Sequence, residues 1–510
     1  MSLSASQSPA ATAGGRAMMS RLLRASSLYM LANVASRAVG FLAVPFYSRF
    51  LSPAEYGLIE LIELSTQVVA IAFGLQSIGP AITRVFHEQP SPETRRAAIS
   101  TGVLSSALLG ALVAAAAVLL SAPLAQGVFR STDHAPLLQA AFVAMFFSSL
   151  SEVALVHERI QERAGFFLAY SLVALFAALA LNILAIGVFG AGVWGFVASK
   201  LIVTTLGSAY LLRRLGREVG WRWRSHFVPQ LARLAAPLAL SGLCYLVIHS
   251  SDRYFLASAV PLAEIGQYAL AYRFAFLIPS LIGEPFYKAW TVTFYRYTGQ
   301  ADWRRQFVRV LSYLVLAEMV AAVALAVCGR ELLALMVPPS FYPPPALLPV
   351  LVLAYVVRDV GDFYRSLLLI DKRTARIAQI AAFGAALNVG LNVWLIPSYG
   401  VHGAALATLL TWLAFTVVCC AAAWREHGVP VPVVPLAAIA ALACGVVGAS
   451  WVWRAPSYAA QISLDAVWVA LFMGLCVPFY LPASERAALR AEAAAVTRRL
   501  LARRRARRGG

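Results

Sequence analysis

Charged residues are scarce in this chain. Only 13% of its 510 residues are Asp, Glu, Lys or Arg, whereas 60% are hydrophobic and the mean hydropathy is +0.74. Soluble globular proteins contain about 25% charged and about 45–50% apolar residues. This excess of apolar side chains excludes an ordinary water-soluble domain, and we therefore expect a membrane protein.

Signals of disulfide and metal chemistry are also missing. All six cysteines lie in apolar runs, at Cys244, Cys328, Cys419, Cys420, Cys444 and Cys476. None of them forms a C-x-x-C pair, so neither a disulfide framework nor a zinc site is expected. We predict no metal and no cofactor.

The usual catalytic motifs do not occur either. There is no G-x-x-x-x-G-K-[ST] motif, and "HERIQ" (157–161) lacks the second histidine of H-E-x-x-H. The letters "GAGVWG" (190–195) fit G-x-G-x-x-G, but the stretches on both sides are apolar spans, which favours a tight turn. We predict no catalytic residue, so the protein should not be an enzyme.

Long apolar stretches dominate what remains. A membrane-crossing helix needs about 20 mainly apolar residues. Fourteen stretches meet this need: 25–48, 57–79, 97–121, 136–157, 166–189, 193–212, 234–256, 264–286, 306–328, 346–370, 376–396, 402–424, 433–453 and 463–482. They predict an all-α polytopic membrane protein with 14 transmembrane helices.

The positive charge is unevenly placed, and the net charge is +19. If the N-terminus is cytoplasmic and the spans alternate, 32 of the 42 Lys and Arg residues fall in cytoplasmic segments and 5 in outer loops. Such a bias sets the orientation of membrane proteins. Arg outnumbers Lys 39 to 3, as in GC-rich bacterial genomes. We expect a multi-pass protein of a bacterial plasma membrane with both termini cytoplasmic.

Two short phrases occur twice. Residues 55–57 (Glu-Tyr-Gly) match residues 264–266 (Glu-Ile-Gly) at an offset of 209, and "LNILAIGVFGAGVWG" (181–195) matches "LNVWLIPSYGVHG" (391–403) at offsets of 208–210. Six spans separate the paired phrases, which predicts two parallel six-helix repeats followed by two further helices. The expected domains are a disordered tail (1–20), a first lobe (21–225), a second lobe (226–428), helices 13 and 14 (429–482) and a basic cytoplasmic tail (483–510).

Four basic residues fall near the centres of predicted spans: Arg37, Lys200, Arg273 and Arg358. Each would cost about 2.5–3.5 kcal/mol if it faced lipid. They outnumber the central acids Glu318 and Asp359, which favours a cationic cavity that binds an anionic pyrophosphate or sugar group. The alternative is structural ion pairing. We expect at least two of Arg37, Arg273 and Arg358 to lack a close carboxylate.

Acidic residues within spans are candidates for carrying a coupling ion. Glu318 and Asp359 are the deepest, and Asp252 is a third candidate. The neighbouring Arg253 also favours an ion pair of Asp252 at the outer rim.

Four other polar residues are expected to have structural roles. Glu60 and Glu63 lie near the outer end of their span, where rim ion pairs are favoured. Asn388 and Asn392 are four residues apart on one helical face and are expected to hydrogen-bond between helices.

Residues 25–84 resemble Wzx-type oligosaccharide flippases of the MOP (multidrug/oligosaccharidyl-lipid/polysaccharide, MATE-like) exporter superfamily, through "ASRAVGFLAVPFYSRFLSPAEYGLIELI" and "FGLQSIGPAITR". "DRYFLASAVPLAEIGQYALAYRF" (252–274) and "YGVHGAALATLLT" (399–411) are similar to later parts of that family. The resemblance implies two lobes around a V-shaped cleft, alternating access and a substrate of undecaprenyl-pyrophosphate-linked oligosaccharide. It also implies a role in O-antigen, capsule or exopolysaccharide biosynthesis.

The resemblance and the charge pattern together define the expected partners. They are the lipid-linked oligosaccharide, anionic inner-leaflet lipids at the basic tail, and a polysaccharide polymerase or export complex, but not nucleic acid. A lipid II flippase of the MurJ type and a MATE drug antiporter are alternative transporters. A polysaccharide polymerase or ligase is an alternative of another class, although the outer loops are short for such an enzyme.

Overall fold

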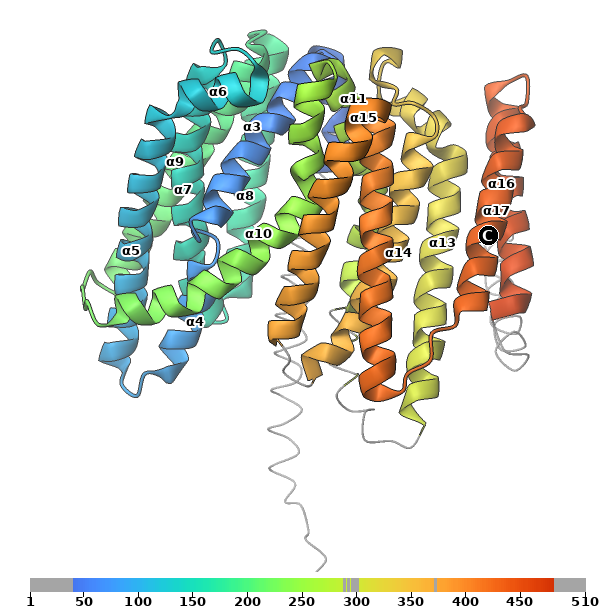
Figure 1. Ribbon diagram of the computed structural model, residues 1–510. Helices are drawn as coiled ribbons and strands as arrows, with labels where there is room; N and C mark the ends of the chain where they lie inside the picture. The colour runs from blue at the N-terminus through green and yellow to red at the C-terminus, as the bar shows by residue number, and fades with distance from the viewer. Residues whose placement is uncertain (1–39, 288–289, 291–293, 295–301, 371–373, 481–510) are drawn as a thin grey trace, which may run out of the picture. The chain divides into compact units, whose positions relative to one another are not determined.

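The computed structural model describes residues 40–287, 290, 294, 302–370 and 374–480, and all regular structure within them is helical (Figure 1). The elements are α2 (Val44–Phe50), α3 (Pro53–Ala72), α4 (Ile78–Glu88), α5 (Pro92–Leu119), α6 (Ser121–Phe129), α7 (Ala135–Ile160), α8 (Ala164–Asn182), η1 (Ile183–Val188), α9 (Gly192–Glu218), α10 (Phe227–Ala259), α11 (Leu262–Ala275), η2 (Pro279–Gly283), α13 (Trp303–Met336), η3 (Pro339–Phe341), α14 (Leu347–Ile370), α15 (Thr374–His427), α16 (Val433–Val452) and α17 (Tyr458–Tyr480).

The predicted spans correspond to these helices. Every predicted span from 57–79 onward has a helical counterpart, and span 25–48 lies mostly outside the described residues. Ten helices of the described part are long and apolar enough to cross a membrane, and one of them, α15, contains two predicted spans. The chain is therefore a multi-pass, all-α membrane protein, as predicted.

Glycine-rich turns separate neighbouring spans. At Gly400, within α15, the backbone adopts φ 52°, a left-handed conformation that suits glycine, so the predicted spans 376–396 and 402–424 are two helices joined by a turn. The stretch "GAGVWG" forms a similar turn, with positive φ at Gly190 and Gly192. This agrees with the predicted turn rather than a nucleotide-binding loop.

Helix α3 begins and ends earlier than its predicted span, 57–79. The Ser52 hydroxyl accepts a hydrogen bond from the amide of Glu55, and the Glu55 carboxylate accepts one from the amide of Ser52. This capping box starts the helix at Pro53. The helix ends at Ala72, before Gly74 with φ 72°, and α4 follows. The sequence does not reveal this break, because the interrupted stretch is itself apolar.

The described chain packs as two compact units. Unit 1 holds the residues up to Arg273 together with Met336–Pro343 and Ala378–Thr411, and unit 2 holds Phe274–Leu335, Pro344–Ile377 and the residues from Trp412 on. The predicted lobes are defined by the internal repeat rather than by packing, and their boundaries remain a prediction.

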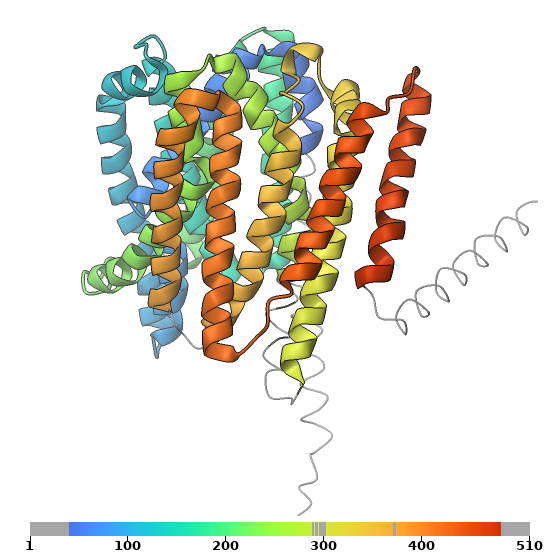
Figure 2. The same cartoon turned by 45° about the vertical axis from the view of Figure 1, so that its right-hand side comes forward.

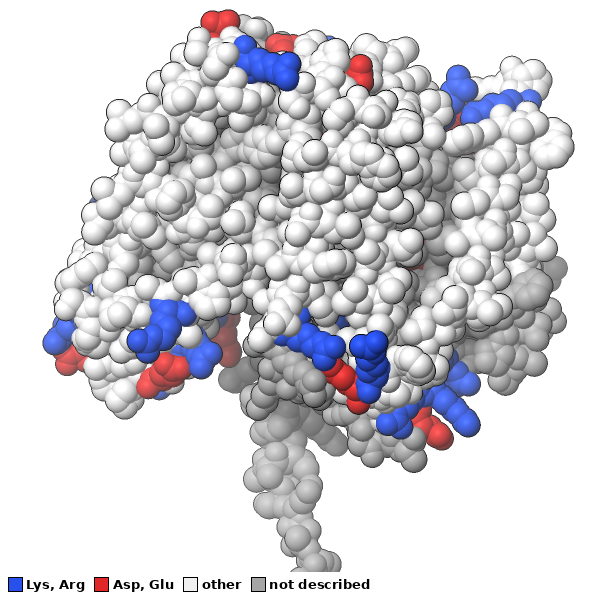
Figure 3. Space-filling view, in the orientation of Figure 1, with Lys and Arg blue, Asp and Glu red and all other residues white. Residues whose placement is uncertain are grey.

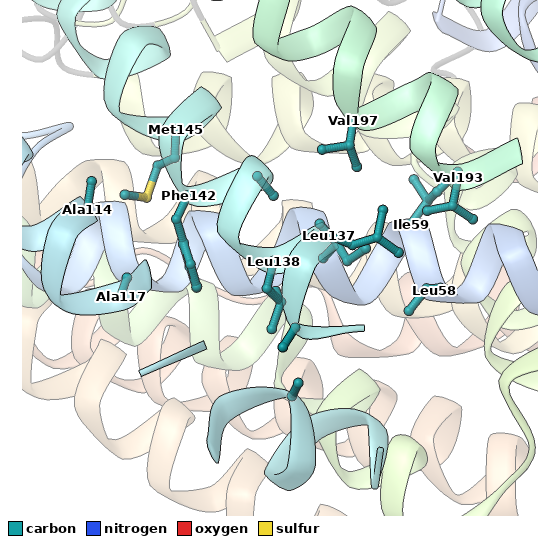
Figure 4. Packing of buried hydrophobic residues seen from close by; sticks show 14 of the residues in the cluster. Leu58, Ile59, Ala114, Ala117, Leu137, Leu138, Phe142, Met145, Val193 and Val197 are labelled. Carbon is teal, nitrogen blue, oxygen red and sulfur yellow. The ribbon is translucent and has the colours of Figure 1, made fainter. Parts of the chain in front are cut away.

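The core of unit 1 is centred on α7, which contacts α3, α4, α5, α6, α8 and α9. Leu138 and Phe142 of α7 lie one helical turn apart and are buried beside Ile59 of α3 and Val197 of α9 (Figure 4). In a membrane, close packing rather than exclusion of water holds such helices together.

Unit 2 contains an aromatic core and a terminal helix pair. The ring of Phe363 on α14 lies 4.3 Å from Phe307 and 4.9 Å from Trp290, centroid to centroid. Helices α16 and α17 contact each other and lie side by side in both views (Figures 1 and 2).

Charged side chains gather at the ends of the helices. On the face in Figure 3 the band between the two ends is almost entirely uncharged. Large apolar side chains that are exposed in unit 1 include Leu112, Leu206 and Trp394. An uncharged band is what a surface in contact with lipid tails requires.

The two copies of the first repeated phrase meet within unit 1. A Cβ atom on Gly57 of α3 would lie closer than 3.0 Å to the carbonyl oxygen of Leu262, and one on Gly266 of α11 closer than 3.0 Å to that of Pro53. Residues 53 and 262, like 57 and 266, are 209 positions apart, so the contact is reciprocal. Both positions therefore require glycine.

The second repeated phrase also makes the same contact twice. Gly195 packs against Ala185 across one turn, and Gly403 packs against Leu395 across the other. The first stretch is two residues longer and includes the π-helix η1, whose turns take one more residue than those of an α-helix. These equivalent contacts support a duplication, although the superposition of the two lobes stays a prediction.

Candidate functional site

One face of α3 carries the polar side chains of Tyr56, Glu60 and Glu63, which we call the α3 polar row. Spacings of four and three residues place them along one side of the helix. Their basic partners come from three other helices of unit 1: Arg253 on α10, Arg273 on α11 and Lys200 on α9. The row thus connects segments that are far apart in the sequence.

Glu60 is shared by two arginines. Its Oε1 lies 3.0 Å from Nε of Arg253, and its Oε2 lies 3.9 Å from a terminal nitrogen of Arg273. The Arg273 guanidinium also lies 5.1 Å from the ring centroid of Tyr56. The Arg273 side chain is 40% exposed, compared with 7% for Arg253. Arg273 is therefore the more weakly held cation and the one open to a ligand.

Lys200 has a close partner in Glu63. Its ammonium nitrogen lies 2.6 and 2.7 Å from the two carboxylate oxygens. The Lys200 side chain is 28% exposed and that of Glu63 39%. The predicted anion-binding residue Lys200 is therefore committed to an ion pair in this state.

Arg253 and Asp252 form a buried ionic cluster. Arg253 lies 3.2 Å from the Asp252 carboxylate, whose other oxygen accepts a 2.5 Å hydrogen bond from the hydroxyl of Tyr268. The guanidinium also lies 4.3 Å from the ring centroid of Tyr272. Each charge has several partners, which compensate for the loss of water. The expected ion pair of Asp252 and Arg253 is confirmed.

A hydrogen-bonded network of amide and hydroxyl side chains connects α10 with α15. Asn388 accepts a hydrogen bond from the Ser251 hydroxyl and donates one to Thr411. Asn392 donates to both Ser251 and Asn388. The predicted hydrogen bonds of Asn388 and Asn392 between helical segments are confirmed.

In unit 2, α14 carries a second ionic cluster. Nε of Arg358 lies 3.3 Å from Asp359 and 3.4 Å from Asp362, and Nε of Arg365 donates a 2.8 Å hydrogen bond to Asp362. The ring of Trp412 lies 5.8 Å from the Arg358 guanidinium. The Arg358 side chain is only 12% exposed. Its surroundings are those of a structural ion pair.

Glu318 of α13 is fully buried beside Asp359. A Cβ atom on Gly283 of η2 would contact a carboxylate oxygen of each acid, so the two carboxyl groups lie together. Neither oxygen of Glu318 accepts a hydrogen bond from a described N–H or hydroxyl donor. Two buried carboxylates side by side repel each other. Arg358, 3.3 Å from Asp359, balances one of these charges, so the other requires a proton or a further cation.

One expectation about the basic residues is wrong. At least two of Arg37, Arg273 and Arg358 were expected to lack a close carboxylate, but Arg273 and Arg358 each lie within 4.0 Å of one. Arg37 lies outside the described residues. The expectation omitted Glu60 and Asp362, which supply the missing negative charge. The cationic excess therefore does not hold for the described clusters.

Glu60 and Glu63 have a larger role than their sequence positions indicate. They were expected to form rim ion pairs, and they do form ion pairs, but their partners include two of the residues predicted to bind substrate. The signal that could have identified this arrangement is the helical spacing of the α3 polar row, which places both acids on one face.

Comparison with known proteins identifies the family. Residues 46–341 match the family described as polysaccharide biosynthesis protein. Among curated relatives, the lipid III flippases of Escherichia coli (strain K12) and Shigella flexneri are each 22% identical over 418 residues. Each alignment covers 80% of this chain and 99% of the relative.

Solved structures share the fold. The lipid II flippase MurJ in an inward closed conformation superposes with a TM-score of 0.68 at 14% identity, covering 88% of this chain and 99% of that one. An inward-facing multidrug resistance MATE family transporter of the MOP superfamily gives 0.61 at 14% identity, covering 78% and 98%. At these identities the similarity shows the fold alone.

The family match extends over more than half of the chain, and the structural neighbours are MOP transporters. Both findings agree with the resemblance to oligosaccharide flippases predicted from residues 25–84. The chain therefore belongs to the polysaccharide biosynthesis protein family and has the fold of MOP superfamily transporters.

Proposed function

We propose that this protein is a flippase and not an enzyme. It moves undecaprenyl-pyrophosphate-linked oligosaccharide repeat units from the inner to the outer leaflet of the bacterial plasma membrane by alternating access, for polysaccharide biosynthesis. The observation that carries the proposal is the family match over residues 46–341. The lipid III flippases, which are related along nearly their whole length, support a lipid-linked substrate.

In the proposed mechanism, Arg273 recognises the pyrophosphate. A half-exposed guanidinium with one carboxylate at 3.9 Å retains donors for a phosphate oxygen. The incoming anion competes with Glu60 for Arg273, and Glu60 then remains paired with Arg253 at 3.0 Å. Lys200 binds the same anion once its ion pair with Glu63 opens. Arg37, which lies outside the described residues, is assigned the same role. Arg358 is assigned here a supporting role through its ion pairs.

The coupling ion is proposed to bind at Glu318 and Asp359. Arg358 balances the charge of one of these two adjacent buried carboxyl groups, and uptake of a proton or sodium ion would balance the other. Asp252 is a weaker candidate, since Arg253 and Tyr268 already engage both of its oxygens.

The test is to delete the gene and identify the lipid-linked intermediate that accumulates. We expect an undecaprenyl-pyrophosphate oligosaccharide on the inner leaflet, and its export to return when the gene is restored. Accumulation of lipid II would instead identify a lipid II flippase, an alternative favoured by the fold of MurJ. Accumulation of flipped but unpolymerised repeat units on the outer leaflet would identify a polymerase or ligase.

A further inference from the structure

A small polar pocket lies in unit 1 at the ends of α4, α5, α7 and α9. Its volume is 340 Å³, and it shares no lining residue with the α3 polar row. Its polar lining residues are Arg95, Arg96, His157, Gln161, Arg163 and Glu218. Three arginines and a histidine against one acid suggest a site for an anion.

Part of this charge is already neutralised. Arg163 contacts the carboxylates of Glu158 and Glu218, at 3.4 and 2.6 Å, and Arg214 contacts the same two acids at 2.8 and 3.1 Å. Two basic and two acidic groups thus balance. His157 adds a 3.2 Å contact from Nε2 to Glu218. These four charges balance one another at the wall of the pocket. They do not balance the positive charges of Arg95 and Arg96.

Arg95 and Arg96 have no carboxylate within 4.0 Å among the described residues. The Nε of Arg95 donates to the carbonyl of Gln89, and its guanidinium lies 5.5 Å from the ring centroid of Phe86, which fixes its direction. Arg96 is exposed. The two residues supply positive charge at the pocket that no acid of the described part of the chain neutralises.

Arg95 and Arg96 do not stabilise helix α5 at the positions where they lie. Both lie in the opening turns of α5, which begins at Pro92. The N-terminus of a helix carries partial positive charge, so cations there are unfavourable and anions are favourable. An anionic ligand in the pocket would be attracted both by the two arginines and by the N-terminus of α5.

A buried nitrogen atom in the pocket also lacks a hydrogen-bond partner among the described residues. The His157 side chain is 7% exposed, and its Nδ1 has no hydrogen-bond partner in the described structure. A buried polar atom without a partner costs about 1–3 kcal/mol. Because Nε2 donates to Glu218, Nδ1 of the neutral imidazole is an acceptor that a protonated phosphate oxygen can donate to, and Nδ1 of the protonated ring is a donor to a ligand oxygen.

We propose that this pocket binds a phosphate-bearing anion through Arg95, Arg96 and His157. Planar guanidinium groups match the oxygens of phosphate, and a diphosphate or a phospholipid headgroup fits a volume of 340 Å³. The site is separate from the proposed path for substrate translocation and does not depend on it.

The test uses the full-length protein in nanodiscs of neutral phosphatidylcholine, with inorganic pyrophosphate as the probe in calorimetric titrations. Arg96→Gln should weaken binding about tenfold, because one charge-assisted contact is lost. Arg95→Gln with Arg96→Gln should abolish it, and Arg96→Lys should retain part of it. The matched control is Arg84→Gln on α4, an exposed arginine paired with Glu88 outside the pocket. Arg96→Gln removes no described contact, so its fold should be intact.

A second arm identifies the source of the phosphate. Native mass spectrometry would compare retention of phosphatidylglycerol by the wild-type protein and by the double variant. Pyrophosphate binding that depends on Arg96 supports a diphosphate ligand. Retention of phosphatidylglycerol that depends on both arginines, without pyrophosphate binding, supports a lipid headgroup. If both measurements are the same for the wild-type and variant proteins, the proposal is wrong.

Discussion

Arg273 lies 3.9 Å from the carboxylate of Glu60, whereas Arg253 lies 3.0 Å from the same group. One acid is thus held tightly by a buried arginine and loosely by an exposed one. The two arginines can therefore be assigned different roles, and substitution can separate them.

The first prediction concerns export. Arg273→Glu should abolish polysaccharide export while the protein remains inserted, because the reversed charge repels a pyrophosphate. Arg273→Lys should retain part of the activity, since the charge remains but the bidentate geometry is lost. The same loss is expected for Arg37→Glu. The measurement is complementation of a strain that lacks the flippase gene, with the membrane level of each variant checked. Arg330→Glu, at an exposed position of α13, is the control. Full export by Arg273→Glu would contradict the proposed role.

The second prediction concerns stability. Arg253→Gln leaves Asp252 buried without its main counter-charge and should lower the free energy of unfolding by about 3–5 kcal/mol. Arg273→Gln should change it by less than about 1 kcal/mol, because the side chain is half-exposed and its ion pair is long. Thermal unfolding of the purified variants in detergent checks both. Equal losses from the two substitutions would show that burial does not distinguish these arginines.

The third prediction concerns the paired glycines. Gly57→Ala and Gly266→Ala should each destabilise the protein by about 1–3 kcal/mol, because the added methyl group meets a backbone carbonyl that cannot move independently. Gly445→Ala in α16 is the control, since nothing lies within 4 Å of the added atom and alanine favours helix. Melting temperatures in detergent should fall for the first two variants only. A melting temperature unchanged by Gly57→Ala would mean that the helices separate readily at this contact.

The fourth prediction concerns coupling. Glu318→Gln should leave stability unchanged or improve it, because a buried carboxylate without an N–H or hydroxyl donor becomes neutral. Transport in proteoliposomes should then no longer respond to an imposed proton or sodium gradient, and Asp359→Asn should behave alike. Glu88→Gln, an exposed acid, is the control. A gradient response retained by both variants would exclude this pair as the coupling site.

Most of the fold follows from the sequence, because hydrophobic length and turn residues are local signals. The spans, the Gly400 turn and the interhelical bonds of Asn388 are of this kind. The break after Ala72 was not predictable, since Gly74 lies in a stretch that is apolar on both sides.

The candidate site was less predictable, because ion pairs depend on which helices become neighbours. Lys200 and Arg358 each lie near the centre of a span, and this position alone suggested binding of an anion. Glu63, the partner of Lys200, became apparent only once the helices were placed, whereas Asp362 lies four residues after Arg358 on the same helix, a spacing that the sequence already shows. A charge count along the sequence cannot tell a free arginine from one whose acid is supplied by another helix or by the next turn of its own helix.

The reciprocal contact of the two glycines also bears on the origin of the chain. In a homodimer with two-fold symmetry, residue i of one subunit contacts residue j of the other, and j contacts i. Gly57 against Leu262 and Gly266 against Pro53 have this form, with the two repeats in place of two subunits. A half-length ancestor with one copy of the phrase would present a surface complementary to itself. Fusion of two such copies turns an interface between molecules into a contact within one chain. The glycine of each half is then required because it packs against the backbone of the other half.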